Sequence, residues 1–273
     1  MALFNFVKKV VEKFTLLAST YRFIRNEIHY KKAPIITPWG FKLHGNNFMA
    51  NGNFEPNETK IVRSLLKDVD VLINVGSNIG YYCCHALSLG KEVLAFEPLQ
   101  NNLRFLCKNI NSNGWICEIH PIALSNKIDI LKLYGGGTGA SLIKGWAGSN
   151  IHKFVDVPCS TLDLIIGDRF QNKKILFIID VEGAEFFVLE GAKNILANNI
   201  KPQWLIEITK EQQQPNGVNT NPNYLKTFNL MFDLGYKAIT IGHDENIDNP
   251  TYFDKENFHI NESNNLYHNY LFI

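Results

Sequence analysis

Between residues 71 and 209, short apolar runs alternate with stretches of helical periodicity. The apolar runs have the length of strands and cover residues 71–75, 92–96, 115–120, 175–181 and 203–209. The helical candidates between them cover residues 81–89, 99–111 and 185–198. Such alternation predicts an α/β fold in which helices cover both faces of a mostly parallel, doubly wound sheet.

The composition limits the class of protein and its partners. The chain has 273 residues, of which 45% are hydrophobic and 19% charged, enough for one large domain with its own core. Lys plus Arg number 27 and Asp plus Glu 26, so no excess of positive charge favours a nucleic acid, and we expect none as a partner. The five cysteines are odd in number and lack paired CxxC spacing, which indicates neither a disulfide framework nor a zinc site. We therefore expect a reducing compartment, the cytoplasm.

We expect residues 1–58 to form an N-terminal extension and residues 59–273 to form the main domain. Apolar side chains recur at three- and four-residue steps from Leu3 to Ile28 with basic residues between them, which predicts a basic amphipathic helix. In one interpretation this helix packs on its own domain or on a second subunit, as in a homodimer. In the other, residues 1–30 contact an anionic membrane surface, at the inner face of a membrane. No apolar stretch predicts a spanning helix or a signal peptide.

Two further apolar runs, at residues 128–134 and 154–158, bracket a glycine-rich segment. We interpret the region near 135–153 as an insertion after the third strand, either a flap over a bound acceptor or a surface loop. Towards the C-terminus, residues 236–241 and 266–273 are predicted to form a closing pair of strands.

The turn after the first strand points to a nucleoside ligand. Its sequence is Gly76-Ser-Asn-Ile-Gly80, and its glycines allow the backbone to approach a ligand at the N-terminus of the following helix. Glu97 ends the next strand, where a carboxylate can accept hydrogen bonds from both ribose hydroxyls. Together these features predict a nucleoside cofactor.

The spacing of the turn disfavours a dinucleotide. The dinucleotide fingerprint has glycine at its first, third and sixth positions, whereas this turn has glycine at the first and fifth and Asn78 at the third. The chain also lacks the Tyr-x-x-x-Lys pair of short-chain dehydrogenases and a Gly-Lys-Ser/Thr phosphate loop. The arrangement suits S-adenosyl-L-methionine, which has an adenosine but no phosphate. A nicotinamide-dependent or sugar-nucleotide enzyme remains the alternative.

Several linked motifs resemble the FkbM family of S-adenosylmethionine-dependent methyltransferases over about residues 51–240. They are, in the family's order, Asn51-Gly-Asn-Phe-Glu-Pro-Asn-Glu-Thr59, the turn Asn74 to Gly80, Ala95-Phe-Glu-Pro98, Gly137-Thr-Gly-Ala-Ser-Leu142, Ser160-Thr-Leu-Asp163, Ile179-Asp-Val-Glu-Gly-Ala-Glu185, Val188-Leu-Glu-Gly-Ala192 and Trp204-Leu-Ile-Glu-Ile208. The resemblance implies a class I methyltransferase sheet of about seven strands and methyl transfer to a hydroxyl of a sugar, glycan or secondary metabolite. The cofactor-binding residues implied are Asn74, Gly76, Ser77, Asn78, Gly80, Glu97, Pro98 and Asp180.

Three carboxylates are our candidates for the chemistry. Asp180 and Glu182 follow a buried strand and alternate to the same side of an extended backbone, and Glu207 ends the next strand. Each is a candidate for removing the hydroxyl proton or positioning the acceptor. His120 and His152 are weaker candidates for the base, because a lone histidine is more often structural. No metal-ligand pattern is present, so we expect transfer without a metal.

Asn74 departs from the family pattern, in which an Asp usually ends the first strand. An amide brings no negative charge to the cofactor. We therefore expect weakened cofactor affinity, or, as an alternative function, a degenerate methyltransferase fold that only binds a ligand.

Overall fold

One mixed sheet of eight strands organises the described part of the chain, which is residue 24 and residues 26–241, 252–258 and 268–273 of a computed structural model. In sheet order the strands are β12 (Tyr252–Phe253), β11 (Ala238–Ile241), β13 (Asn269–Phe272), β10 (Gln203–Glu207), β9 (Ile175–Ile179), β3 (Val71–Val75), β4 (Glu92–Phe96) and β5 (Glu118–His120). The strands from β10 to β5 are parallel, and β13 is antiparallel to both of its neighbours.

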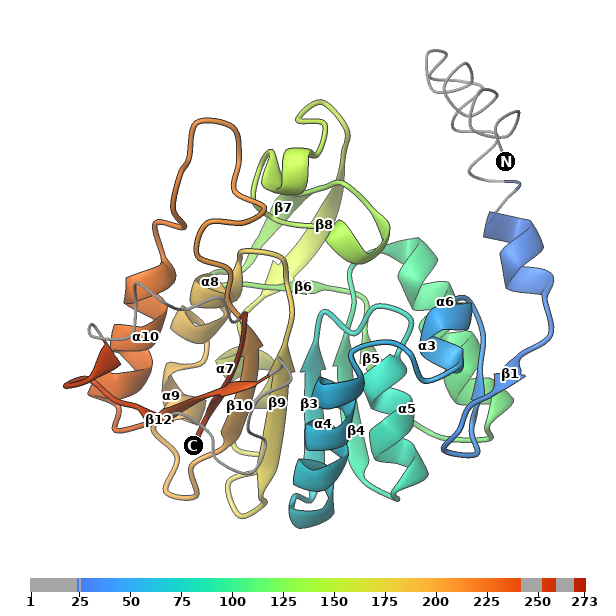
Figure 1. The fold of residues 1–273 in the computed structure, drawn as a ribbon, viewed down its shortest axis with the longest axis horizontal. Helices are drawn as coiled ribbons and strands as arrows, with labels where there is room; N and C mark the ends of the chain where they lie inside the picture. Colours follow the sequence, from blue (N-terminus) through green and yellow to red (C-terminus); the bar gives the residue numbers. More distant parts are fainter. Residues whose placement is uncertain (1–23, 25, 242–251, 259–267) are drawn as a thin grey trace.

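Helices cover both faces of this sheet (Figure 1). One face carries α4 (Pro56–Asp68), α5 (Tyr81–Ser88) and α6 (Gln100–Ser112), and the other carries α7 (Leu162–Ile166), α8 (Glu185–Glu190), α9 (Lys193–Leu196) and α10 (Tyr224–Asp233). Every residue of β3 and β9 is buried, as expected for central parallel strands. The predicted doubly wound α/β class is confirmed, with β12 extending the sheet beyond seven strands.

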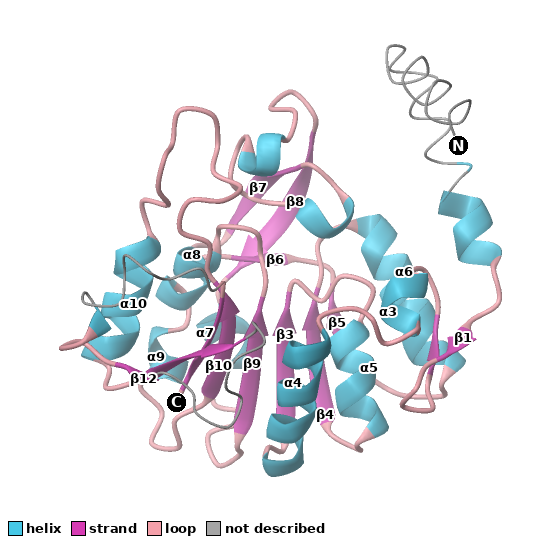
Figure 2. Cartoon of the chain, viewed as in Figure 1, coloured by secondary structure: helices cyan, strands magenta, loops and turns pink. Residues whose placement is uncertain are grey.

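A second, three-stranded sheet has the order β6 (Ala123–Leu124), β8 (Phe154–Ser160), β7 (Asp129–Tyr134). Figure 2 shows it above the carboxyl ends of the main sheet. The segment between β7 and β8 contains the short helical turns η1 (Gly137–Gly139) and η2 (Trp146–Gly148). The predicted insertion is therefore a hairpin with an elaborated tip, placed where an open α/β sheet binds its ligands.

The N-terminal segment contributes β1 (Ile35–Ile36), β2 (Lys42–Leu43) and α3 (Asn47–Ala50). Phe41, Leu43 and Met49 belong to the apolar cluster that also holds α4, α5 and α6. Most of the predicted amphipathic helix lies outside the described residues, so its membrane and dimer interpretations stay predictions. The division of the chain at residue 58 also stays a prediction. Among the described helices, none is long and apolar enough to cross a bilayer.

His85 on α5 is fully buried among aromatic rings, with its ring 4.4 Å from that of Trp39 and 4.6 Å from that of Tyr81. Its Nδ1 accepts a hydrogen bond from the Arg63 guanidinium at 3.0 Å, so the neutral tautomer carries its proton on Nε2. Burial and the Arg63 charge lower the pKa of His85 to about 3. The folded protein therefore excludes the charged imidazolium.

We expect this histidine to make stability depend on pH. Between pH 6.5 and about 3 the unfolded state binds a proton that the folded state does not, so stability falls as the pH falls, by about 1.4 kcal/mol per pH unit. Urea unfolding of the wild type and of His85→Phe at pH 7.5 and pH 5 checks this. The wild type should lose about 2 kcal/mol more than the variant on acidification. Equal losses would show that His85 does not carry the effect.

Candidate functional site

The candidate site lies where the chain reverses its direction of travel across the sheet. β3 has β4 on one side and β9 on the other, and the crevice outside the carboxyl ends of such strands is the usual ligand site in open α/β sheets. A cleft of about 560 Å³, counting space open to solvent, occupies this position. Its lining residues are Val75, Gly76, Asn78, Phe96, Glu97, Pro98, Asn102, Ile122, Ala123, Leu124, Leu133, Gly137, Thr138, Ala140, Leu142, Asp180, Val181 and Glu182.

The turn at Gly76 brings the ends of three strands together. Its N–H and that of Ser77 both donate to the carbonyl oxygen of Phe96 at 3.0 Å. Gly76 has φ +81°, and a Cβ at this position would lie 1.8 Å from the carbonyl oxygen of Asp180. Only glycine therefore fits where β3 and β9 approach at the cleft floor.

Glu97 presents a buried carboxylate to the cleft. Its side chain is 4% exposed, its Oε2 accepts the Asn78 N–H at 2.8 Å, and its Oε1 accepts the Leu99 N–H at 2.8 Å. Burial raises the pKa of Glu97 to about 7 even though these hydrogen bonds favour the ionised form. Each carboxylate oxygen retains acceptor capacity for a ligand hydroxyl.

Three of the predicted cofactor residues hold the turn together and do not line the cleft. The Ser77 hydroxyl donates to the Asn74 carbonyl at 2.7 Å and accepts the Phe96 N–H at 3.1 Å. The amide of Asn74 points to Cys83 Sγ, 3.5 Å away. Gly80 lies against Leu106, whose Cδ1 would be 2.4 Å from an added Cβ. A direct cofactor contact by any of the three stays a prediction.

Carboxylates gather on the β9 and β10 side of the cleft. Asp180 and Glu182 both line it, and the side chain of Asp180 is exposed to the open cleft, although surrounding protein atoms reduce its solvation. Desolvation, followed by repulsion from Glu207, raises the pKa of Asp180 well above its ordinary range. Desolvation, followed by repulsion from Glu182 and Glu55, raises the pKa of Glu207. Glu207 does not line the cleft, but its charge raises the pKa of Asp180, which does.

Glu185 differs from Asp180 and Glu182 because it does not line the cleft. It is buried and accepts the Gly183 N–H at 2.8 Å, at the start of α8. Desolvation raises its pKa to about 7. Its negative charge is favourable at a helix N-terminus.

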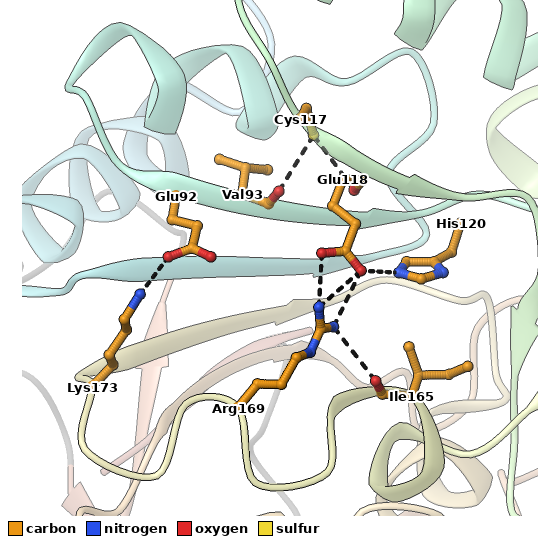
Figure 3. Close-up of polar contacts among 8 residues, drawn as sticks. All are labelled: Glu92, Val93, Cys117, Glu118, His120, Ile165, Arg169 and Lys173. Atoms are coloured by element: carbon orange, nitrogen blue, oxygen red, sulfur yellow. Dashed lines mark hydrogen bonds and ion pairs between the residues drawn. The ribbon is translucent and has the colours of Figure 1, made fainter.

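The two histidine candidates lie outside the cleft lining. The ring of His120 stacks on Phe96 at 4.8 Å, and its Nε2 lies 2.7 Å from Oε1 of Glu118 (Figure 3). Arg169 bonds both oxygens of the same Glu118 carboxylate, at 2.9 and 3.1 Å. These contacts place His120 in an ion-pair network on β5. His152 is exposed in the β7–β8 connection.

Sequence reasoning missed part of the site. Ile122 to Leu124 line the cleft directly after β5, and the rule that ligands bind at strand ends could have found them. Asn102 lines it from α6, and its amide donates to the Gly137 carbonyl at 3.0 Å, a contact between distant segments that no local pattern reveals. Glu55 does not line the cleft, and its motif had been given no role in the chemistry, but its charge raises the pKa of Asp180. It has φ +42°, its carboxylate accepts the Tyr82 hydroxyl at 2.6 Å, and desolvation raises its pKa to about 7.

The model of the FkbM methyltransferase domain matches residues 74–238, which include the turn, Glu97 and all three candidate carboxylates. The chain belongs to the FkbM methyltransferase family. The strand order of its sheet agrees with the class I methyltransferase fold that the motifs implied. A search of curated proteins gave no match. Within the described residues, no group of three His, Cys, Asp or Glu side chains is arranged to hold a metal ion.

Solved methyltransferase structures are similar to this FkbM family member at low sequence identity. The FkbM methyltransferase of Methylobacillus flagellatus KT is 15% identical with a TM-score of 0.45, and the match covers 93% of this chain and 60% of that chain. An rRNA methylase of Streptococcus thermophilus is 12% identical with a TM-score of 0.41, over 79% of this chain and 92% of that one. M. jannaschii TYW2, solved in complex with AdoMet, is 15% identical with a TM-score of 0.39, over 85% and 80%.

Proposed function

We propose that the protein is an S-adenosylmethionine-dependent O-methyltransferase that acts on a hydroxyl of a sugar, glycan or secondary-metabolite acceptor. One observation favours S-adenosylmethionine as the cofactor. Three carboxylates, those of Glu97, Asp180 and Glu182, line the cleft, and the described lining residues include no Lys, Arg or His. A cationic nucleoside suits such an acidic wall, whereas the pyrophosphate of a dinucleotide or sugar nucleotide would find no cationic side chain among the described lining residues.

The residues present fit this cofactor. Glu97 would accept the ribose hydroxyls, and the backbone of Gly76, which lines the cleft, would take the amino-acid tail. Asp180 and Glu182 would face the positive charges.

When bound, the cofactor supplies a methyl group on a sulfonium, and the protein's task is to align the acceptor and remove its hydroxyl proton. Asp180, Glu182 and Glu207 all have raised pKa values, caused first by desolvation. A carboxylate whose pKa approaches the working pH is a stronger base than an ordinary surface carboxylate. We assign proton removal and acceptor positioning to this group of three.

The degenerate fold is the competing proposal, and it rests on Asn74. The Asn74 side chain is buried against Cys83 and is not among the lining residues, so its neutral amide removes no charge from the cleft wall. This placement favours an active enzyme.

Calorimetric titration with S-adenosylmethionine and with NAD tests the proposal. We expect S-adenosylmethionine to bind and NAD not to bind. We also expect the affinity for S-adenosylmethionine to rise about five- to tenfold from pH 6 to pH 8, because Glu97, with its pKa near 7, must be ionised to face a cation and accept both hydroxyls. Micromolar binding of NAD with none of S-adenosylmethionine would overturn the assignment.

Transfer of a labelled methyl group to hydroxylated sugars and cell-envelope fractions would then identify the acceptor. Label in a hydroxyl-bearing product supports O-methylation. Cofactor binding without transfer to any fraction would favour the degenerate fold. The same assay with a chelator tests the prediction that transfer needs no metal.

A further inference from the structure

The tip of the β7–β8 hairpin forms two hydrogen bonds to Glu182. We call residues 135–153 the flap. Trp146 in the flap is 2% exposed, and its Nε1–H donates to Oε2 of Glu182 at 2.7 Å. The Ser141 hydroxyl donates to the backbone carbonyl of Glu182 at 2.5 Å. The flap therefore contacts both the side chain and the main chain of one residue in the cleft wall.

The indole ring of Trp146 also requires a glycine beneath it. A Cβ on Gly183 would lie 2.4 Å from Cζ3 of Trp146 and 2.7 Å from its Cε3. The missing side chain lets the ring lie directly on the backbone next to Glu182. The Trp146 ring thus packs on Gly183 while its N–H bonds to the neighbouring Glu182.

Glu182 itself has a strained backbone. Its φ is +56°, in the left-handed region, which costs a residue with a side chain about 1 to 2 kcal/mol. Such a conformation persists only where the surroundings hold it, and the contacts from Ser141 and Trp146 are of that kind. Glu182 has this strained conformation at a position where it lines the cleft, two residues after Asp180.

Glu182 lies among other acidic side chains. Asp180 and Glu185 lie on the same segment and Glu207 on β10, and Glu182 raises the pKa of all three by repulsion. Glu55, at the start of α4, acts in the same way on Asp180 and Glu207. Burial raises the pKa of Glu182, and the hydrogen bond from Trp146 opposes that shift. The indole N–H is thus a favourable partner in an acidic environment.

We propose that Trp146 is a positioning residue: it holds the Glu182 carboxylate in the cofactor cleft and couples that position to the docking of the flap. This inference rests on the proposed function, because it assumes that the cleft binds S-adenosylmethionine. A flap that leaves the cleft then releases Glu182 at the same time. The Ala147 N–H, which donates to the Gln213 carbonyl at 2.7 Å, extends the coupling to the loop after β10.

The indole N–H resonances test the link without any cofactor. In ¹H–¹⁵N spectra recorded from pH 4.5 to 8.5, we expect the Trp146 signal, assigned from its loss in Trp146→Phe, to shift with a midpoint above the ordinary carboxylate range. The shift should disappear in Glu182→Gln. Trp204 is the matched control, because its Nε1–H donates to the Tyr236 hydroxyl, which does not titrate in this range. A Trp146 signal that behaves like that of Trp204 would overturn the proposal.

Cofactor affinity tests the positioning role. Trp146→Phe removes the N–H donor and also shortens the ring that packs over Gly183, and we expect it to weaken S-adenosylmethionine binding about fivefold. In the Glu182→Gln background the same change should cost less than twofold, because Trp146 acts through the carboxylate. Equal losses in both backgrounds would indicate a merely structural role. If the wild type does not bind S-adenosylmethionine, the proposed function fails, whereas the indole titration still decides the link to Glu182.

Discussion

Replacing Gly76 with alanine is expected to abolish cofactor binding and to destabilise the protein by about 3 kcal/mol or more. The added Cβ would lie 1.8 Å from the Asp180 carbonyl oxygen, and the strained φ of +81° adds about 1 kcal/mol. The backbone cannot move away at low cost. Gly76 N–H donates to Phe96 on β4, and Asp180 N–H donates to Val75 on β3 at 3.1 Å. Urea unfolding and calorimetry with S-adenosylmethionine measure the two effects.

Gly90→Ala is the matched control for this change. Gly90 follows α5 and has φ +72°, but a Cβ there meets nothing within 4 Å. Gly90 therefore has a left-handed backbone like Gly76, but no neighbouring atom approaches the position of its Cβ. We expect a loss of about 1 kcal/mol and unchanged cofactor affinity. If the two alanine variants lose the same stability and bind the cofactor equally well, the close approach of β3 and β9 does not shape the site.

Glu97→Gln is expected to weaken S-adenosylmethionine binding by about 100-fold, which corresponds to about 2.7 kcal/mol. The amide removes the charge and replaces one acceptor oxygen by a donor, so charge-assisted hydrogen bonds to the ribose are lost. The Asn78 and Leu99 N–H groups, now both bonded to the carboxylate, would also compete for a single oxygen. The rise in affinity between pH 6 and pH 8 should become smaller. Calorimetry at both pH values measures both effects.

Glu92→Gln is the control on the same strand. Glu92 begins β4 at the end opposite to Glu97, and its exposed carboxylate pairs with Lys173 (Figure 3). A surface ion pair of this kind contributes about 1 kcal/mol or less, so we expect little change in stability and none in cofactor affinity. Equal losses of affinity in the Glu92 and Glu97 variants would show that the position of the carboxylate does not matter, and would contradict the role of Glu97 in binding the cofactor.

The central strands could be predicted from local sequence. The predicted bounds of β3 and β4 coincide with the observed ones, because each is a short apolar run that ends in a turn at Gly76 or in Glu97. The helix predicted over residues 185–198 is instead two short helices, α8 and α9, on either side of Gly191. A Cβ on Gly191 would lie 2.2 Å from the Ser125 carbonyl oxygen, and this tertiary approach cannot be read from helical periodicity.

The site was predictable where its residues follow strand ends. Gly76, Asn78, Glu97, Pro98, Asp180 and Glu182 all line the cleft. Asn74 and Ser77 share the same motif, but the Ser77 side chain bonds within the turn and the Asn74 side chain points to Cys83 on α5, and only the fold shows these directions. The opposite wall comes from α6 and the flap. The sequence predicted the flap as an insertion but left open whether it covers an acceptor or forms a surface loop.

A crystal structure of the protein with S-adenosylmethionine tests the central claim most directly. The account predicts both ribose hydroxyls within hydrogen-bond distance of the Glu97 carboxylate, with the amino-acid tail over Gly76 and the sulfonium towards Asp180. A ligand bound elsewhere, or a Glu97 carboxylate that makes no contact with the ribose, would contradict it.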